Sequence, residues 1–76
     1  MKRALGNIRL YDRDGECIIN LDKFIQMRGI YVRRNSQDNY EHSFDIILEE
    51  NNKITLTYNN KIAAQEQWAN LYERLK

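Results

Sequence analysis

The chain has 76 residues, of which 30% are charged and 42% hydrophobic, and its formal net charge is +1. A chain of this length forms a single domain that buries too little surface to be very stable, and such domains often gain stability by oligomerising. A net charge near zero excludes a general field that would attract nucleic acid or an anionic membrane. We therefore expect one domain over residues 1–76, with a lead-in at 1–6, strands over 7–58 and a helix over 60–75.

The chain has one cysteine, Cys17, so no intrachain disulfide can form and an intracellular protein is favoured. We interpret Cys17 as a small buried hydrophobe, because no sequence motif supplies an activating group for its thiol. No apolar stretch reaches the length of a membrane span, and the N-terminus lacks the apolar core of a signal peptide. The sequence predicts a cytoplasmic protein with no membrane contact, and its asparagine-rich composition is typical of a bacterial or phage source.

The first half of the chain predicts three strands. Residues 7–11 and 16–20 form the first two, joined by an Asp- and Gly-containing turn at 12–15. After a corner at 20–23, residues 24–34 predict a long third strand whose apolar positions change parity at Gly29. A single inserted residue has this effect, and glycine is common at such bulges. We therefore expect a bulge at or beside Gly29.

The second half opens on the clearest alternation in the chain. Apolar or aromatic residues share one parity across two further strands, with polar residues between them, so each strand should bury one face. We expect these strands to be joined by a turn at 50–52 and to pair with one another in register. The expected facing pairs are Val32 with His42, Arg33 with Glu41, Met27 with Ile46, Ile25 with Leu48, Leu48 with Ile54, Ile46 with Leu56, and Phe44 with Tyr58.

The final segment has the period of a helix and begins after Asn59 or Asn60, either of which is a natural N-cap. Its apolar stripe should cover the sheet, with Trp68 as a core anchor. The complete prediction is an α+β fold: a bent, half-barrel-like, five-stranded antiparallel meander with one C-terminal helix on its concave face. The stripe consists of Ala64, Trp68, Leu71, Tyr72 and Leu75.

Two resemblances follow from these patterns. A glycine turn, an apolar strand ending in Asn20 and a second apolar run at 24–27 resemble small bacterial flagellar proteins of the FlbD type, although Leu21 stands where a proline usually follows that asparagine. The strands followed by the final helix also resemble the C-terminal half of a pleckstrin-homology domain. Both resemblances imply binding or scaffolding, and neither supplies a binding residue.

No residue set predicts catalysis, so we expect no enzyme, no cofactor and no metal site. His42 is the only histidine, and it falls on the inward parity, which favours a packed side chain. Asp12, Asp14 and Glu16 belong to a turn far shorter than a calcium-binding loop. The three glycines are too far apart to form a phosphate loop.

One face of the predicted sheet carries both basic and aromatic residues: Arg9, Tyr11, Tyr31 and Arg33. Such a face can stack on and neutralise single-stranded nucleic acid. Because carboxylates share the same face, a solvated surface with cross-strand ion pairs is the favoured interpretation. Binding of single-stranded nucleic acid through these four residues remains the alternative function.

The function that the sequence favours is a non-enzymatic protein-interaction module, homo-oligomeric or bound to another protein. A small meander leaves two free sheet edges, at its first and fifth strands, and these offer unpaired backbone groups. A small accessory or modulator protein fits this prediction, including a phage- or plasmid-borne inhibitor of a host protein.

Overall fold

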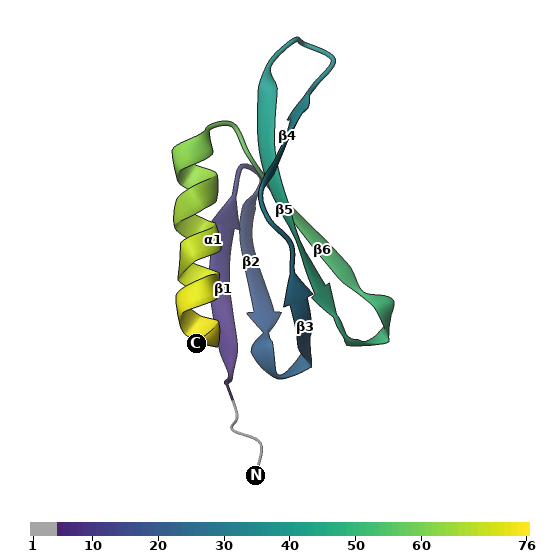
Figure 1. The fold of residues 1–76 in the computed structure, drawn as a ribbon, viewed down its shortest axis with the longest axis vertical. Coiled ribbons are helices and arrows are strands. Elements are labelled where there is room, and N and C mark those ends of the chain that lie inside the picture. The colour runs from purple at the N-terminus through teal and green to yellow at the C-terminus, as the bar shows by residue number, and fades with distance from the viewer. Residues whose placement is uncertain (1–4) are drawn as a thin grey trace.

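The computed structural model describes residues 5–76 of the chain. Within these residues, six antiparallel strands form two sheets and are followed by one C-terminal helix, which is an α+β fold (Figure 1). The expected lead-in at 1–6 falls mostly outside the described part of the chain. The elements are β1 (Asn7–Asp12), β2 (Gly15–Asn20), β3 (Phe24–Met27), β4 (Tyr31–Arg34), β5 (Tyr40–Leu48), β6 (Lys53–Tyr58) and α1 (Lys61–Leu75).

The strands do not form the single five-stranded meander that the sequence predicted. β1 and β2 make a separate hairpin, while β3 and β4 follow one another along one edge of β5 and β6 pairs with its other edge. The reason lies at the corner Leu21–Lys23, a short 3-10 turn that the Asn20 side chain caps by accepting a hydrogen bond from the Asp22 amide at 3.0 Å. This turn leads the chain out of the hairpin, so β2 never pairs with β3.

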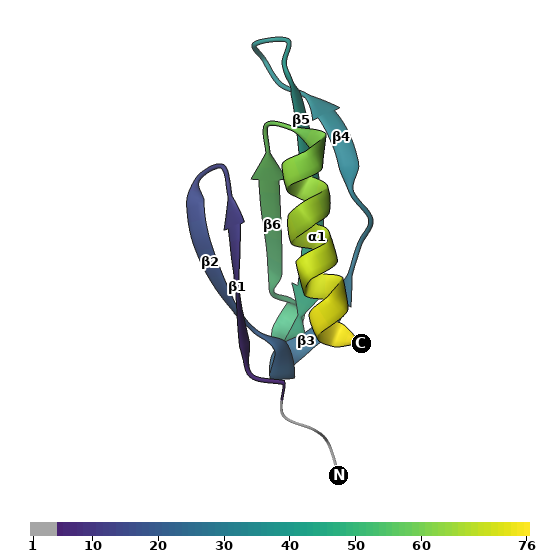
Figure 2. The same ribbon diagram turned by 90° about the vertical axis from the view of Figure 1, so that its left-hand side faces the viewer.

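The hairpin and the helix cover the same side of the four-stranded sheet. β1 contacts α1, and α1 in turn contacts β5 and β6, so the two lie side by side above the sheet (Figure 2). Their apolar faces meet in one core because each element has a single apolar side to bury. The fully enclosed core residues are Leu10, Ile19, Leu21, Phe44, Ile46, Leu56, Tyr58, Ala64 and Leu71.

The predicted irregularity at Gly29 is confirmed, and it is larger than one bulge. Met27 faces Ile46 and Tyr31 faces Ser43, so the register shifts by one residue between β3 and β4. The Arg28 amide still donates to the Asp45 carbonyl at 2.9 Å, and the break lies at Gly29 and Ile30. A second shift lies between Phe24 and Gln26. Because of it, Phe24 takes the place opposite Leu48 that Ile25 was expected to fill, and Ile25 is 56% exposed.

The register between β5 and β6 differs from the prediction by two residues. Phe44 faces Leu56 and Ile46 faces Ile54, because the connection is a short 3-10 turn at Glu49–Asn51, which is centred one residue earlier than the expected turn at 50–52. Glu50 and Asn51 take left-handed backbone angles, with φ of 65° and 62°, and the Leu48 amide donates to the Asn52 carbonyl at 2.8 Å. A shift of two keeps every residue on its predicted face.

The helix begins where the sequence predicted, with Asn60 as its N-cap accepting a hydrogen bond from the Ala63 amide at 2.7 Å. Ala64 and Leu71 are fully buried, whereas Trp68 is only partly buried. Tyr72 was expected in the core stripe, but it is 45% exposed because it lies at the rim, stacked on Trp68 with ring centroids 5.3 Å apart.

Candidate functional site

The four residues of the predicted basic and aromatic face lie in two separate places. Arg9 and Tyr11 belong to β1 in the hairpin, and Tyr31 and Arg33 belong to β4 in the four-stranded sheet. β1 contacts β6, on the far side of β5 from β4, so the structure does not bring the two pairs into one stacking surface. Arg9 also forms an ion pair with Glu16 at 3.4 Å.

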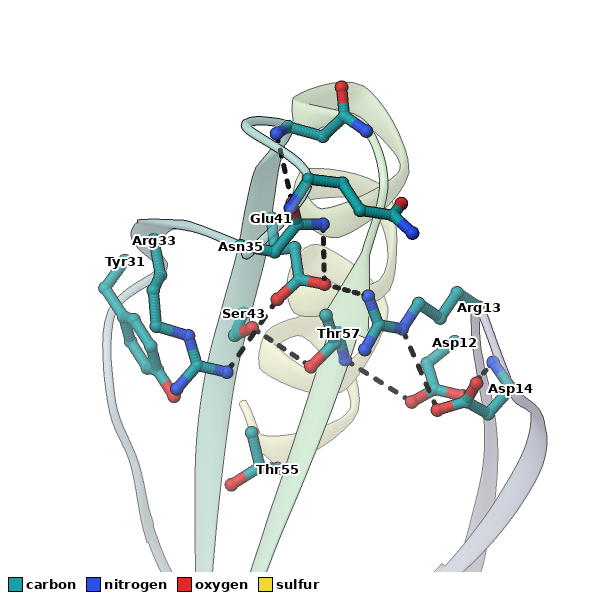
Figure 3. Close-up of polar contacts among 12 residues, drawn as sticks. Asp12, Arg13, Asp14, Tyr31, Arg33, Asn35, Glu41, Ser43, Thr55 and Thr57 are labelled. Carbon is teal, nitrogen blue, oxygen red and sulfur yellow. Dashed lines mark hydrogen bonds and ion pairs between the residues drawn. The ribbon is translucent and has the colours of Figure 1, made fainter.

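Arg33 belongs instead to a charge cluster centred on Glu41 (Figure 3). The Glu41 side chain is only 8% exposed, and its carboxylate accepts hydrogen bonds from Arg13 Nη1 and from Asn35 Nδ2, the latter at 3.4 Å. Arg33 Nη2 lies 3.8 Å from the same carboxylate. The hydrogen bond from Arg13 holds the pKa of Glu41 below its ordinary value and raises the pKa of Arg13. Because Arg13 lies in the turn between β1 and β2, this ion pair joins the hairpin to the main sheet.

Neighbouring polar groups also link the β1–β2 hairpin to the main sheet. The Arg13 amide donates to the Thr57 carbonyl at 3.0 Å, and the Thr57 amide donates to Asp12 Oδ2 at 3.3 Å. The Thr57 and Ser43 hydroxyls are hydrogen-bonded to one another at 3.1 Å, and both residues are buried (Figure 3). These groups satisfy one another, so the cluster stabilises the junction between the two sheets.

A third set of contacts occupies the same outer face further along β5. Asp45 accepts hydrogen bonds from the Thr55 hydroxyl at 2.8 Å and from the Tyr31 hydroxyl at 3.3 Å. Burial, followed by the charge of Asp45, raises the pKa of Tyr31. Tyr31 thus acts as a hydrogen-bond donor to the sheet while 38% of its surface stays exposed.

The remaining reactive groups lie on the inner face. His42 is partly buried, and its Nδ1 has no hydrogen-bond partner among residues 5–76; the same holds for the hydroxyl of Tyr58, which faces it on β6. Burial raises the pKa of the Tyr58 hydroxyl and of the Cys17 thiol, and the charge of Asp12 adds to both shifts. No cluster of His, Cys, Asp or Glu suited to a metal ion occurs within the described residues.

The most prominent exposed feature is the distal hairpin, which we define as residues 31–43. It projects beyond the helix and the β1–β2 hairpin along the 49 Å long axis of the molecule (Figure 1). Val32 and Tyr40 lie on its inner face, beyond the cover of α1, and each is 56% exposed. In the described part of the chain no strand pairs with the second edge of β4, so the outward backbone groups of that edge are free.

The sequence indicated part of this surface. The Arg33–Glu41 pair follows from strand register, so it could be predicted. Two features were missed: the contribution of Arg13, and the free edge at β3 and β4, which the sequence placed inside the meander. Neither missed feature has a local signal, because both depend on how the hairpin turns away from the sheet. The first and fifth predicted strands, now β1 and β6, each pair on one side only among residues 5–76, as expected.

Comparison with known proteins gives no further guide: no family model, no curated protein and no solved structure matches this chain. The resemblances to FlbD-type proteins and to pleckstrin-homology domains therefore stay predictions. Among residues 5–76, no helix is long and apolar enough to cross a membrane.

Proposed function

We propose that this protein is a non-enzymatic protein-interaction module of the cytoplasm that self-associates through the free edge of β4. The observation that carries the proposal is the combination of an unpaired strand edge with two large exposed side chains, Val32 and Tyr40, on the same projecting hairpin. A strand edge attracts another strand because pairing satisfies its outward N–H and C=O groups. A small domain also gains buried apolar area by pairing.

The sequence of β4 suits pairing with a second copy about a two-fold axis. In antiparallel pairing centred on Val32, the two Val32 side chains face one another on the inner side, where each is now 56% exposed. On the outer side, Tyr31 of each copy faces Arg33 of the other. An arginine beside an aromatic ring in this position adds a cation–π contact. Two of the four residues that the sequence singled out thus acquire a role in this interface.

The break at Arg28 to Ile30 limits how far the pairing extends. No strand continues through these residues, and the Arg28 carbonyl accepts a hydrogen bond from Trp68 Nε1 at 3.1 Å, so this stretch presents no regular strand edge. An interface centred on β4 is therefore short, and its stability depends on the side chains around Val32. We expect association that depends on concentration in the micromolar range.

Light scattering and sedimentation over a concentration series test this proposal. The wild type should move from 9.2 kDa towards twice that mass as concentration rises. Val32→Lys should stay monomeric, because two like charges would face one another across the axis. At concentrations where the wild type is monomeric, its melting temperature should equal that of the wild type, since the side chain is mostly exposed.

Ile18→Lys is the matched control, because Ile18 is 57% exposed in β2, which pairs only with β1 in the separate hairpin, and the chemical change is the same. This variant should associate like the wild type. A mass of 9.2 kDa at every concentration would refute self-association. A Val32→Lys protein that associates as strongly as the wild type would place the interface elsewhere.

A further inference from the structure

The free edge of the main sheet carries a local excess of positive charge. Residues 23–37 include β3 and β4, whose unpaired sides form this edge, and they contain no aspartate or glutamate. The basic residues of this segment are Lys23, Arg28, Arg33 and Arg34, and all of them are exposed. Lys23 and Arg28 form no ion pair with any residue that the structure describes. Because the whole chain is nearly neutral, the excess belongs to this edge and not to the protein as a whole.

The nearest carboxylates leave this charge largely uncompensated at the surface. Glu41 and Asp45 belong to β5, the strand next to the edge, and both are buried and hydrogen-bonded within the domain. Arg33 Nη2 lies 3.8 Å from Glu41, yet 64% of the Arg33 side chain remains exposed. Such a contact leaves most of the guanidinium free to meet a carboxylate from another chain.

Arg34 is held in place at the same edge without being neutralised. Its guanidinium lies over the Tyr40 ring, 5.3 Å from the ring centroid, and donates a hydrogen bond to the Tyr40 hydroxyl at 3.0 Å. The nearby carboxylate of Asp38 is 3.5 Å away, and both side chains of this pair are mostly exposed. Exposed ion pairs of this kind contribute little free energy, so Arg34 can exchange its partner readily.

The backbone of β4 presents hydrogen-bonding groups on the same side. The Asn35 amide donates to the Asn39 carbonyl at 2.9 Å, in the register of the β4–β5 ladder. Hydrogen-bonded and non-hydrogen-bonded pairs alternate along an antiparallel ladder. Arg33 therefore bonds towards β5, whereas Val32 and Arg34 direct their N–H and C=O groups to the free edge.

We propose that the free edge of β4 binds an extended acidic segment of another protein as an added antiparallel strand. The segment carries an apolar residue opposite Val32, where 56% of the valine is exposed, and acidic residues opposite Arg33 and Arg34. This inference rests on the proposed function in that both use the same edge, so the acidic strand and a second copy exclude one another. A second copy brings its own arginines to a basic edge, whereas an acidic strand brings opposite charge. The acidic strand is therefore the tighter partner.

A peptide strand suits this edge better than a nucleic acid does. The outward N–H and C=O groups of Val32 are satisfied by another strand, which supplies both kinds of group in turn. Single-stranded nucleic acid binds through free aromatic faces on which its bases stack. At this edge Arg34 already covers one face of the Tyr40 ring, and the Tyr31 hydroxyl is bonded to the sheet.

The test is titration of the ¹⁵N-labelled full chain with an end-capped peptide of sequence TEEVTV, followed by amide chemical shifts. In the antiparallel register its two glutamates lie opposite Arg34 and Arg33, and its first valine lies opposite Val32. Saturable shifts are expected at Tyr31 to Arg34. The charge-reversed peptide TKKVTV should bind about tenfold more weakly, because like charges then face one another. Methylation of the first valine nitrogen of TEEVTV should weaken binding to a similar degree, because it removes the N–H that pairs with the Val32 carbonyl.

The double variant Arg33→Gln, Arg34→Gln should weaken TEEVTV about fivefold, since two exposed cations are lost. The matched control is Arg9→Gln, Lys53→Gln, which removes the same charge from exposed positions on β1 and β6. It should leave binding within about twofold, because distant exposed charges are screened. Circular dichroism checks that both double variants fold.

Light scattering with and without saturating TEEVTV distinguishes the acidic strand from self-association. A protein that binds TEEVTV but stays at 9.2 kDa without it supports the acidic strand and refutes self-association alone. A protein that self-associates but shows no saturable shift in β4 overturns the acidic strand alone. The proposal is also overturned by equal affinity for TEEVTV and TKKVTV, by full affinity of the methylated peptide, or by equal loss in the two double variants. Displacement of TEEVTV by a lower concentration of oligothymidine would instead assign the edge to nucleic acid.

Discussion

Replacement of Trp68 tests how α1 holds the interrupted edge of the main sheet. The indole Nε1 donates to the Arg28 carbonyl at 3.1 Å, and the ring stacks on Tyr72 with centroids 5.3 Å apart. Trp68→Phe removes the hydrogen bond and keeps an aromatic ring in place. Trp68→Ala removes the hydrogen bond, the stacking and the packing against the core.

The expected losses follow from these contacts. A hydrogen bond of this kind contributes about 1 kcal/mol, so Trp68→Phe should cost about that much. Truncation of a buried tryptophan to alanine costs about 3–5 kcal/mol, and Trp68 is only partly buried, so we expect about 3 kcal/mol for Trp68→Ala. Each kcal/mol lowers the melting temperature of a domain of this size by about 4–8 °C.

Thermal and urea unfolding followed by circular dichroism measure both losses, with light scattering on the same samples. Tyr72→Phe is the control, because it keeps the stacked ring and should melt like the wild type. If Trp68→Phe melts like the wild type, the bond to Arg28 does not hold the edge. If Trp68→Ala keeps its melting temperature while its mass falls, Trp68 is an interface residue and its assignment to the packing of the domain is wrong.

Three further predictions concern the two sheet faces. Ser43→Ala should lower the free energy of unfolding in urea by about 1–2 kcal/mol, because it leaves the buried Thr57 hydroxyl unpaired. The double variant that also carries Thr57→Val should recover most of that loss. If the double variant were destabilised as much as Ser43→Ala alone, the hydrogen bond between the two hydroxyls would be unimportant. In the folded protein the pKa of Glu41 lies below its ordinary value of 4.5, so the unfolded chain binds the proton first, and the stability that the Glu41 carboxylate contributes is lost as pH falls below 4.5. The melting temperature of the wild type should therefore decline more steeply below this pH than that of Glu41→Gln. Parallel declines of the two proteins would contradict this prediction. The Cys17 thiol, with its pKa raised by burial, should react with iodoacetamide at pH 8 more slowly in the folded protein than in urea, and equal rates would show that it is accessible.

Local pattern was enough to predict most of the elements and the apolar face of the long strand β5. The alternation from Tyr40 to Leu48 predicts a strand with one apolar side, and Phe44 and Ile46 are indeed fully buried. The change of period after Asn60 predicts the helix and its cap, and the parity change at Gly29 predicts the break in the edge strand. These predictions succeed because side-chain direction in a strand or helix depends only on nearby residues.

The tertiary structure alone decided which strands meet. The corner at Leu21–Lys23 turns the chain away from the hairpin, and this separates β2 from β3 and leaves the edge of β4 free. The same change brings Arg13 to Glu41, across 28 positions of sequence. It also brings the hairpin over Tyr58, on the inner face of β6. Period and parity carry no information about such contacts, because they depend on the path of the backbone between elements and on the packing of all of them around one core.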